Sequence, residues 1–315
     1  MAARKILAYG AIYVLWGGSF LAIREIVAVV PPFFAAGFRF MVAGLALLLW
    51  SRFDARFELR PRQMLGSIAL GLVMFTCDYA SLFWAETRVA SGIAAVVFAM
   101  IPVWIFAGEV FLLRERRATA ISLGGIALGF AGVVVLGLRP SNAATHGSSG
   151  LSTFAILVML GGTFCWSAGT LWSRRLALPR PQHANSGLQM FSGGIFLLLL
   201  AAGTGELHRL PAMHVLLSAR VIASMAYLIV AASIVSYSAY VWLIAHDSPT
   251  RVSSYAYVNP VFALMIGAAL AGERLTPLEM AGAALVVGGV FATLLGRSRT
   301  PVKPAAQMER RAALR

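Results

Sequence analysis

The sequence has little charge. Of its 315 residues only 12% are Asp, Glu, Lys or Arg, whereas 59% are hydrophobic and the mean hydropathy is +0.80. Ordinary soluble domains carry about 25% charged residues, so the composition excludes a soluble globular fold. A helix that crosses a bilayer needs about 20 mostly apolar residues, and such runs follow one another along the chain. We therefore expect an all-α polytopic membrane protein whose surroundings are the lipid bilayer.

Cysteine is also scarce. The two cysteines, Cys77 and Cys165, lie inside apolar runs, which favours small buried residues over a disulfide or a metal site. The signatures HExxH, CxxC, GxSxG and the Walker A loop do not occur in the sequence. We therefore expect no cofactor, no metal and no enzymatic activity. A membrane-embedded enzyme acting on a lipid-linked substrate is the minor alternative.

The charge that is present is mostly positive, with a formal net charge of +14. The arginines lie in short gaps between apolar runs, as membrane topology requires, and do not gather in one basic domain. We expect no nucleic-acid partner. If the N-terminus is cytoplasmic, the connections on that side hold most of the 26 lysines and arginines. This asymmetry predicts an even number of helices with both termini in the cytoplasm.

Ten apolar segments have the length of a membrane helix. We expect helices at about 6–24, 32–50, 64–86, 89–112, 118–138, 151–172, 185–203, 220–243, 250–271 and 277–296. The tail, residues 297–315, is basic and rich in proline and alanine, and we expect it to be disordered.

The two halves of the chain repeat one another at constant spacings. The matching pairs are Trp16 with Trp166, Tyr79 with Tyr237, Trp84 with Trp242, and Pro102 with Pro260. Residues 6–138 and 151–296 would then be two five-helix repeats. Because five is an odd number, the second repeat must lie in the membrane upside down relative to the first. Inverted repeats of this kind are typical of secondary transporters, which bind substrate near the midplane of the bilayer.

Several stretches resemble a known family. They are VLWGGSFLAIR at 14–24, PPFFAAGFRFMVAG at 31–44, SGIAAVV at 91–97 and SYAYVNPV at 254–261. These stretches resemble EamA-domain carriers of the drug/metabolite transporter (DMT) superfamily, and most closely its YedA-like subgroup. The resemblance covers essentially residues 6–296, and it implies a ten-helix exporter of the inner membrane. Known relatives export amino acids or other metabolites. Asp78 departs from the subgroup, in which we expect a small or polar neutral residue.

Ionisable side chains inside membrane helices are costly and are functional candidates by default. Arg39 and Asp78 each lie about eight residues from the same end of neighbouring helices, hence about 12 Å deep at 1.5 Å per residue. We predict that they pair. The pair could be a structural lock, or it could serve coupling or gating. Glu109 is expected to reach the cytoplasmic surface beside Arg114 and Arg116.

Prolines and aromatic side chains supply the other candidates. Pro102 and Pro260 would relax the backbone where helices bend, and we assign them to gating. Tyr255 and Asn259 share one helical face whose counterpart in the first repeat is apolar, which favours a substrate site. Helix-to-helix hydrogen bonding is the alternative. The predicted substrate-binding residues are Trp16, Tyr79, Trp84, Trp166, Tyr237, Tyr255, Tyr257 and Asn259.

Glycines on the predicted helices 118–138 and 277–296 allow close packing of those two helices, and the contact could extend to a homodimer. The leading interpretation is a secondary transporter that exports a small metabolite, an amino acid or an amphipathic compound by alternating access between the repeats. A channel or a lipid translocator is the alternative. The sequence leaves the substrate open, and also whether transport is proton-coupled or facilitated.

Overall fold

The computed structural model describes residues 2–54, 58, 60–114, 117–138, 149–247, 252, 255–272 and 276–296. In these parts of the chain the regular structure is helical, apart from an isolated bridge between Glu58 and Arg180. The predicted disordered tail, residues 297–315, lies outside the described residues.

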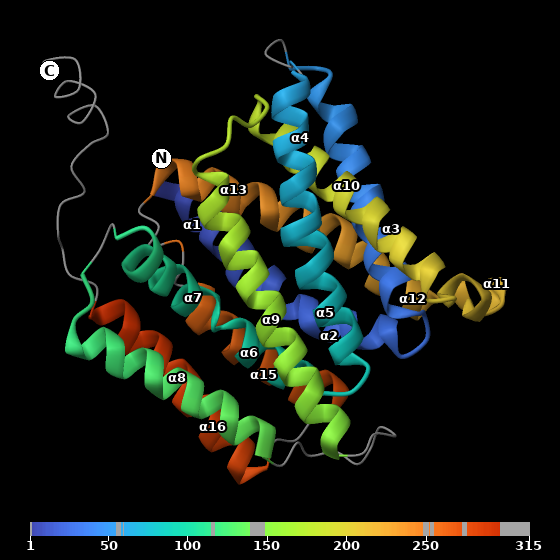
Figure 1. Ribbon diagram of the computed structural model, residues 1–315. Coiled ribbons are helices and arrows are strands. Elements are labelled where there is room, and N and C mark those ends of the chain that lie inside the picture. Colours follow the sequence, from blue (N-terminus) through green and yellow to red (C-terminus); the bar gives the residue numbers. More distant parts are fainter. Residues whose placement is uncertain are drawn as a thin grey trace, which may run out of the picture.

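The described residues form the ten apolar helical segments that the sequence predicts (Figure 1). Eight are long and apolar enough to cross a membrane, and two shorter apolar helices complete the set. Spans 1 to 5 are α1, η1 and α2 (Ala2–Gly10, Ala11–Leu15, Trp16–Val27); α3 (Pro32–Ser51); α4, η2 and α5 (Pro61–Leu70, Gly71–Cys77, Asp78–Glu86); α6, α7 and η3 (Ser91–Phe98, Ile101–Ala107, Gly108–Leu112); and α8 (Ala120–Leu138). Spans 6 to 10 are α9 (Ser149–Ser173); α10 (Gln182–Gly203); α12, η5 and α13 (Ala219–Ala226, Tyr227–Val235, Ser236–His246); α15 (Tyr255–Ala271); and α16 (Pro277–Leu295). Two short helices, η4 (Glu206–Arg209) and α11 (Met213–Leu216), connect spans 7 and 8.

Local sequence signals explain where several helices begin. Pro32, Pro61 and Pro277 each stand in the first turn, where a proline costs no hydrogen bond. Thr276 and Glu279 form a capping box before α16. The threonine hydroxyl accepts from the N–H of Glu279 at 3.3 Å, and the glutamate carboxylate accepts from the N–H of Thr276 at 2.7 Å.

The packing of the spans follows the inverted repeat. Span 2 packs on span 7 and span 5 packs on span 10, so each of these helices meets its own counterpart. Span 1 packs on spans 8 and 9, and span 6 makes the equivalent contacts with spans 3 and 4. The contacts that span 1 of the first half makes with the second half are therefore repeated by span 6 of the second half with the first. Two inverted copies of one five-helix unit require this pattern, and the fold class that the sequence predicts is confirmed.

Glycines allow span 2 to approach span 7, and span 5 to approach span 10, very closely. A β-carbon added at Gly44 would lie 2.3 Å from the backbone nitrogen of Phe191, and one added at Gly289 would lie 2.3 Å from the nitrogen of Gly129. The predicted packing of the two glycine-bearing helices thus occurs within one chain, between α8 and α16. The homodimer stays a prediction, and it would have to use the outer faces of these helices.

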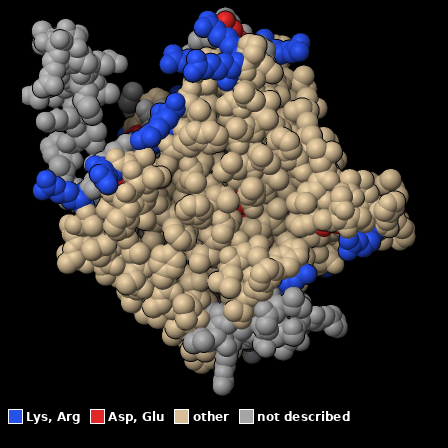
Figure 2. All heavy atoms as spheres, in the orientation of Figure 1, with Lys and Arg blue, Asp and Glu red and all other residues tan. Residues whose placement is uncertain are grey.

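Most of the charged side chains in the described part of the chain lie at the two ends of the bundle. In Figure 2 most lysines and arginines gather along the upper and left edges, over the end at which the N-terminus lies in Figure 1. A broad belt almost without charge separates them from a few at the lower right. We call the end that holds the N-terminus the proximal face, and the opposite end, where α2 and α5 finish, the distal face.

Candidate functional site

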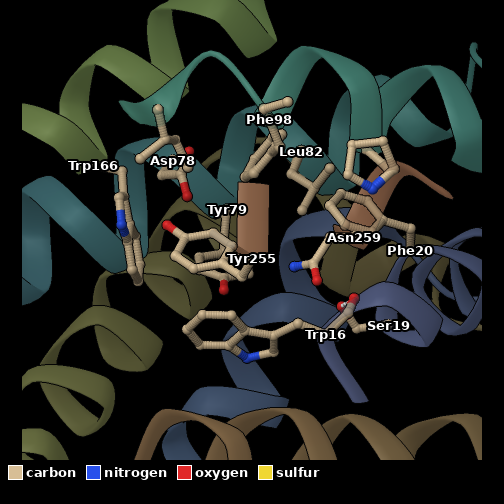
Figure 3. A pocket seen from close by; sticks show the side chains of 14 residues that line it. Trp16, Ser19, Phe20, Asp78, Tyr79, Leu82, Phe98, Trp166, Tyr255 and Asn259 are labelled. Carbon is tan, nitrogen blue, oxygen red and sulfur yellow. Dashed lines mark hydrogen bonds between the residues drawn. The ribbon is translucent and has the colours of Figure 1, made fainter. Parts of the chain in front are cut away.

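A small cavity lies at the centre of the bundle, between spans 1, 3, 4, 6 and 9. Its volume is about 50 Å³, enough for a water molecule. Its lining residues come from both halves of the chain, and Figure 3 draws them: Trp16, Ser19, Phe20, Asp78, Tyr79, Leu82, Ala95, Phe98, Ala99, Ile101, Trp166, Tyr255, Asn259 and Pro260. We call this space the central cavity.

A larger cavity of about 380 Å³ lies between the central cavity and the proximal face. Tyr255 lines both spaces, so the two adjoin. We call the larger one the vestibule. Its polar lining side chains are Glu109, Thr170, Ser173, Arg174, Gln182, Asn185, Gln189, Tyr237 and Tyr240, together with Tyr255.

Glu109 does not reach the surface as predicted. Its side chain is buried, and its Oε1 lies 3.5 Å from Nη1 of Arg174, at the end of span 6. The prediction placed it beside the arginines that follow span 4 in sequence. Arg174 comes from the other half, and it reaches Glu109 because span 6 packs along span 4 and ends at the same face. Arg116, one of the two predicted neighbours, lies outside the described residues.

Most of the predicted substrate-binding residues come together. Trp16, Tyr79, Trp166, Tyr255 and Asn259 line the central cavity, and Tyr237 lines the vestibule. Trp84 lies elsewhere: its ring packs edge-on against Phe154, with centroids 5.8 Å apart, and the guanidinium of Arg88 stacks 3.9 Å above it. The side chain of Tyr257 lies outside the described part of the chain.

The aromatic side chains around the cavity form a fixed wall. The ring of Trp16 lies 5.4 Å from that of Tyr255 and 5.3 Å from that of Tyr240, and Trp166 lies 6.0 Å from Tyr79. Such tilted and edge-to-face contacts contribute about 0.5–1.5 kcal/mol each beyond the buried area. The indole of Trp16 also donates to a backbone carbonyl of span 8 at 2.9 Å. These contacts hold the rings in defined orientations.

Asn259 links span 9 to span 1. With its amide oriented for hydrogen bonding, Nδ2 donates to the carbonyl oxygens of Ile12 at 3.2 Å and Tyr13 at 3.1 Å. Both carbonyls belong to η1, a π-helical segment that departs from the usual hydrogen-bond ladder of a helix. The side chain therefore holds two helices together at the edge of the cavity, as the alternative interpretation of this residue expects.

The two repeat-related prolines lie in different backbone environments. Pro102 is the second residue of α7, directly after the turn at 99–100 that divides span 4. Pro260 lies inside α15, which continues through it. At the break in span 4 the hydroxyl of Ser167 donates to the carbonyl of Ile101 at 3.1 Å. The same hydroxyl is 2.7 Å from the carbonyl of Thr163 in its own helix, so it is shared between spans 4 and 6 beside the break.

Arg39 and Asp78 do not pair, contrary to the prediction. Arg39 is 1% exposed and donates from Nε to Oγ of Ser233 at 2.8 Å, while its guanidinium lies over the rings of Phe40 and Tyr79 at 4.6 and 5.3 Å. Asp78 is equally buried and lines the central cavity. Adjacent residues of a helix point about 100° apart, so span 3 presents Tyr79 to the arginine and turns Asp78 away.

The distal side of the central cavity is closed. The rings of Phe20 and Phe98 meet edge to face across it at 5.7 Å. Beyond them the guanidinium of Arg24, at the end of span 1, donates to the backbone carbonyl of Glu86 and, at 3.2 Å, to that of Val89. These bonds join span 1 to the turn between spans 3 and 4. The cavity thus adjoins the vestibule on its proximal side and is sealed on its distal side.

Comparison with known proteins identifies relatives over the whole membrane domain. The family model described as "EamA-like transporter family" matches residues 5–138 and 153–295. "Uncharacterized inner membrane transporter YedA" of Escherichia coli (strain K12) is 33% identical over 298 residues, covering 93% of this chain and 92% of that protein. "Probable amino-acid metabolite efflux pump" of Salmonella typhimurium (strain LT2) is 28% identical over 290 residues, covering 90% of this chain and 93% of that protein. One solved crystal structure, 19% identical in sequence, matches with a TM-score of 0.63 over 94% of this chain and 98% of that chain, which shows the likeness of fold alone.

Proposed function

We propose, from the premise that this chain belongs to the EamA-like transporter family, that it exports a small organic compound across the inner membrane. The chain is a multi-pass membrane transporter of the DMT superfamily. The finer proposal concerns its mode of action. It acts as a secondary transporter that binds substrate in the central cavity and opens that cavity to one side of the membrane at a time.

The place of the central cavity between the two inverted halves carries this proposal. Trp16 and Asp78 come from the first half, whereas Trp166 and Tyr255 come from the second. A site shared between the halves changes its shape and its access whenever helices of one half move against the other. The vestibule on the proximal side and the contact of Phe20 with Phe98 on the distal side support a carrier rather than a continuous pore.

The relative named as a probable efflux pump supports export as the direction, and the basic proximal face indicates the orientation in the membrane. Membrane proteins retain lysine and arginine on the cytoplasmic side, so we place the proximal face and both termini in the cytoplasm. The vestibule then opens inward, and substrate enters it from the cytoplasm. Drug-sized ligands need pockets of about 300–1,000 Å³, so the central cavity must widen toward the vestibule when substrate binds. Its aromatic walls favour a compound that is at least partly apolar.

Counterflow into proteoliposomes tests this proposal. Purified protein is reconstituted with a panel of amino acids and small amphiphiles inside, and uptake of labelled solute is followed. We expect uptake that saturates and is competed by unlabelled solute, and Trp16→Ala should raise the half-saturating concentration about tenfold, since a buried ring contact is lost. Trp84→Ala is the matched control, because this tryptophan lies outside the cavity. Linear uptake without counterflow would instead indicate a channel.

A further inference from the structure

The central cavity carries one formal charge, and that charge is negative. Asp78 is the one Asp, Glu, Lys or Arg among the described lining residues. It is 1% exposed, and its Oδ1 has no hydrogen-bond partner in the described part of the chain. The nearby hydroxyl of Ser81 donates to the backbone carbonyl of Asp78 at 2.6 Å, so its proton is directed to the main chain and not to the carboxylate. Figure 3 shows the carboxylate directed into the space that Trp166 and Tyr255 border.

Two arginines of neighbouring spans make contacts of their own, and neither lines the central cavity. Arg39 donates to Ser233, lies over the ring of Tyr79, and has the buried carboxylate of Glu86 within electrostatic range. Arg24 binds backbone carbonyls at the distal closure. A carboxylate buried without a counter-charge is costly, and it is stabilised by taking up a proton or a cation. In this cavity the positive charge has to come from outside the lining.

The walls of the cavity suit an organic cation. Besides the two phenylalanines of the distal closure, four aromatic residues line the same space as the carboxylate: Trp16, Tyr79, Trp166 and Tyr255. The face of an aromatic ring attracts an ammonium group, by about 2 kcal/mol or more where water is excluded. Aromatic walls with one acidic group thus complement a positive charge on a partly apolar body.

We propose that the central cavity binds the ammonium group of an amine, with Asp78 as its counter-ion. The inference rests on the proposed function, since it names the chemical class of the transported compound. An amino acid with a free carboxylate fits less well, because the described lining of the central cavity offers its negative charge no cation and places Asp78 nearby. The arginine of the adjoining vestibule, Arg174, is already paired with Glu109 at 3.5 Å. The preferred substrate is therefore an amine that lacks a carboxylate and has an apolar or aromatic body.

Binding of three matched probes to the purified full chain tests this inference. Benzylamine and benzyltrimethylammonium are cations, whereas benzyl alcohol has nearly the shape of benzylamine without the charge. We expect both cations to bind at least about tenfold more tightly than the alcohol, as measured by calorimetry or tryptophan fluorescence. Asp78→Asn should abolish this preference, and Asp78→Glu should retain part of it.

Glu206→Gln is the control variant. Its carboxylate is buried too, but it lies in the distal connection, where it accepts from the N–H of Phe34 at 2.9 Å. This change should leave the preference for cations intact. Gel filtration and thermal unfolding establish that each variant is folded, and the comparison of probes on the unmodified protein needs no variant.

Equal affinity for benzylamine and benzyl alcohol would overturn the inference, and so would an unchanged preference in Asp78→Asn. Failure to bind benzyltrimethylammonium, which cannot exchange a proton, also overturns it and leaves Asp78 as a proton site. Saturable counterflow of neutral solutes without cation preference would contradict this inference and leave the proposed transport function standing. Cation binding without saturable movement of any solute would instead contradict the proposed transport function.

Discussion

At the residue scale, the orientation of one amide determines the role of Asn259. Its Nδ2 donates to the carbonyls of Ile12 and Tyr13, so the nitrogen is essential to the contact. Asn259→Asp replaces that donor with an oxygen that faces two carbonyl oxygens. We expect a loss of about 2–4 kcal/mol in the free energy of unfolding, from the lost bonds and the unpaired buried acceptor. Denaturant or thermal unfolding in detergent measures the effect.

Asn185 supplies the matched control for this prediction, because there the oxygen makes the contacts. Its Oδ1 accepts from the hydroxyl of Ser67 at 2.7 Å and from Nε2 of Gln189 at 2.9 Å. Asn185→Asp keeps that acceptor and should cost less than about 1 kcal/mol. Equal losses at positions 185 and 259 would contradict the orientation assigned to Asn259.

Arg39 provides a second prediction at this scale. The planar guanidinium can donate to Ser233 while it lies flat over the rings of Phe40 and Tyr79, whereas a lysine ammonium is a point charge. Arg39→Lys should therefore lower the stability by about 1–2 kcal/mol. A double-mutant cycle with Ser233→Ala should show coupling of about 1 kcal/mol in the unfolding free energy. Recovery of stability by the exchange Arg39→Asp with Asp78→Arg would contradict the observed arrangement and restore the predicted pair.

The sequence indicates which residues are unusual but not which way they point. Hydropathy alone identifies Arg39 and Asp78 as ionisable groups inside spans. Their equal depth suggests a pair, but the rotation of span 3 places Tyr79 against the arginine instead. Phe98 carries no sequence signal at all, since a buried phenylalanine in an apolar helix looks the same at a closure as in a core. Contact partners depend on helix rotation, which apolar sequences specify poorly.

At the element scale, the long helices can be predicted from the sequence, whereas the short π-helical segments within them cannot. A run of about 20 apolar residues specifies a membrane helix, so the ten spans follow from composition. The π-helical segments η1, η2, η3 and η5 were not foreseen, because one extra residue per turn leaves no mark on composition. They lie in spans 1, 3, 4 and 8, which border the central cavity or the vestibule.

Helix packing gives a prediction that neighbouring glycines can test. A β-carbon at Gly289 would lie 2.3 Å from the backbone nitrogen of Gly129, whereas one at Gly288 would meet nothing nearer than 3.9 Å. Gly289→Ala should therefore force α16 away from α8 and cost about 1–3 kcal/mol, while Gly288→Ala should be nearly neutral. Thermal unfolding of both variants measures the difference. The opposite order of effects would indicate that the outer face of α16 is the packed one, as in a dimer.

At the scale of the whole molecule, contacts between the halves bear on how the transporter moves. Span 1 is tied to span 8 by an ion pair of Lys5 with Asp247 at 3.0 Å near the proximal face and by one of Glu25 with Arg220 near the distal face. The hydroxyl of Tyr227 also donates to a carbonyl of span 1 at 2.9 Å. Helices from different repeats are thus bound together along their length. Alternating access would then move bodies that mix the halves, although the sequence alone suggests that one repeat rocks against the other.

The distal closure is where such a movement has to begin, and Arg24 holds it. Its guanidinium joins span 1 to the carbonyls of Glu86 and Val89, and a hydrogen bond from a charged donor contributes about 1.5–3 kcal/mol. In a background with Cys77→Ser and Cys165→Ser, Ala95→Cys places a thiol in the central cavity. Arg24→Ala should raise the rate at which a membrane-impermeant maleimide, added at the distal face, labels this thiol by about tenfold or more.

Arg209→Ala separates loss of the closure from loss of positive charge at the same face. Arg209 is exposed on η4 and donates to the carbonyl of Thr204 at 2.6 Å, within its own connection. Its removal should leave the labelling rate unchanged, because no contact between spans 1 and 4 is broken. If Arg209→Ala raised labelling as much as Arg24→Ala, attraction or repulsion of the reagent would explain both. If neither variant raised it, the aromatic contact of Phe20 with Phe98 would be sufficient to keep the distal side closed.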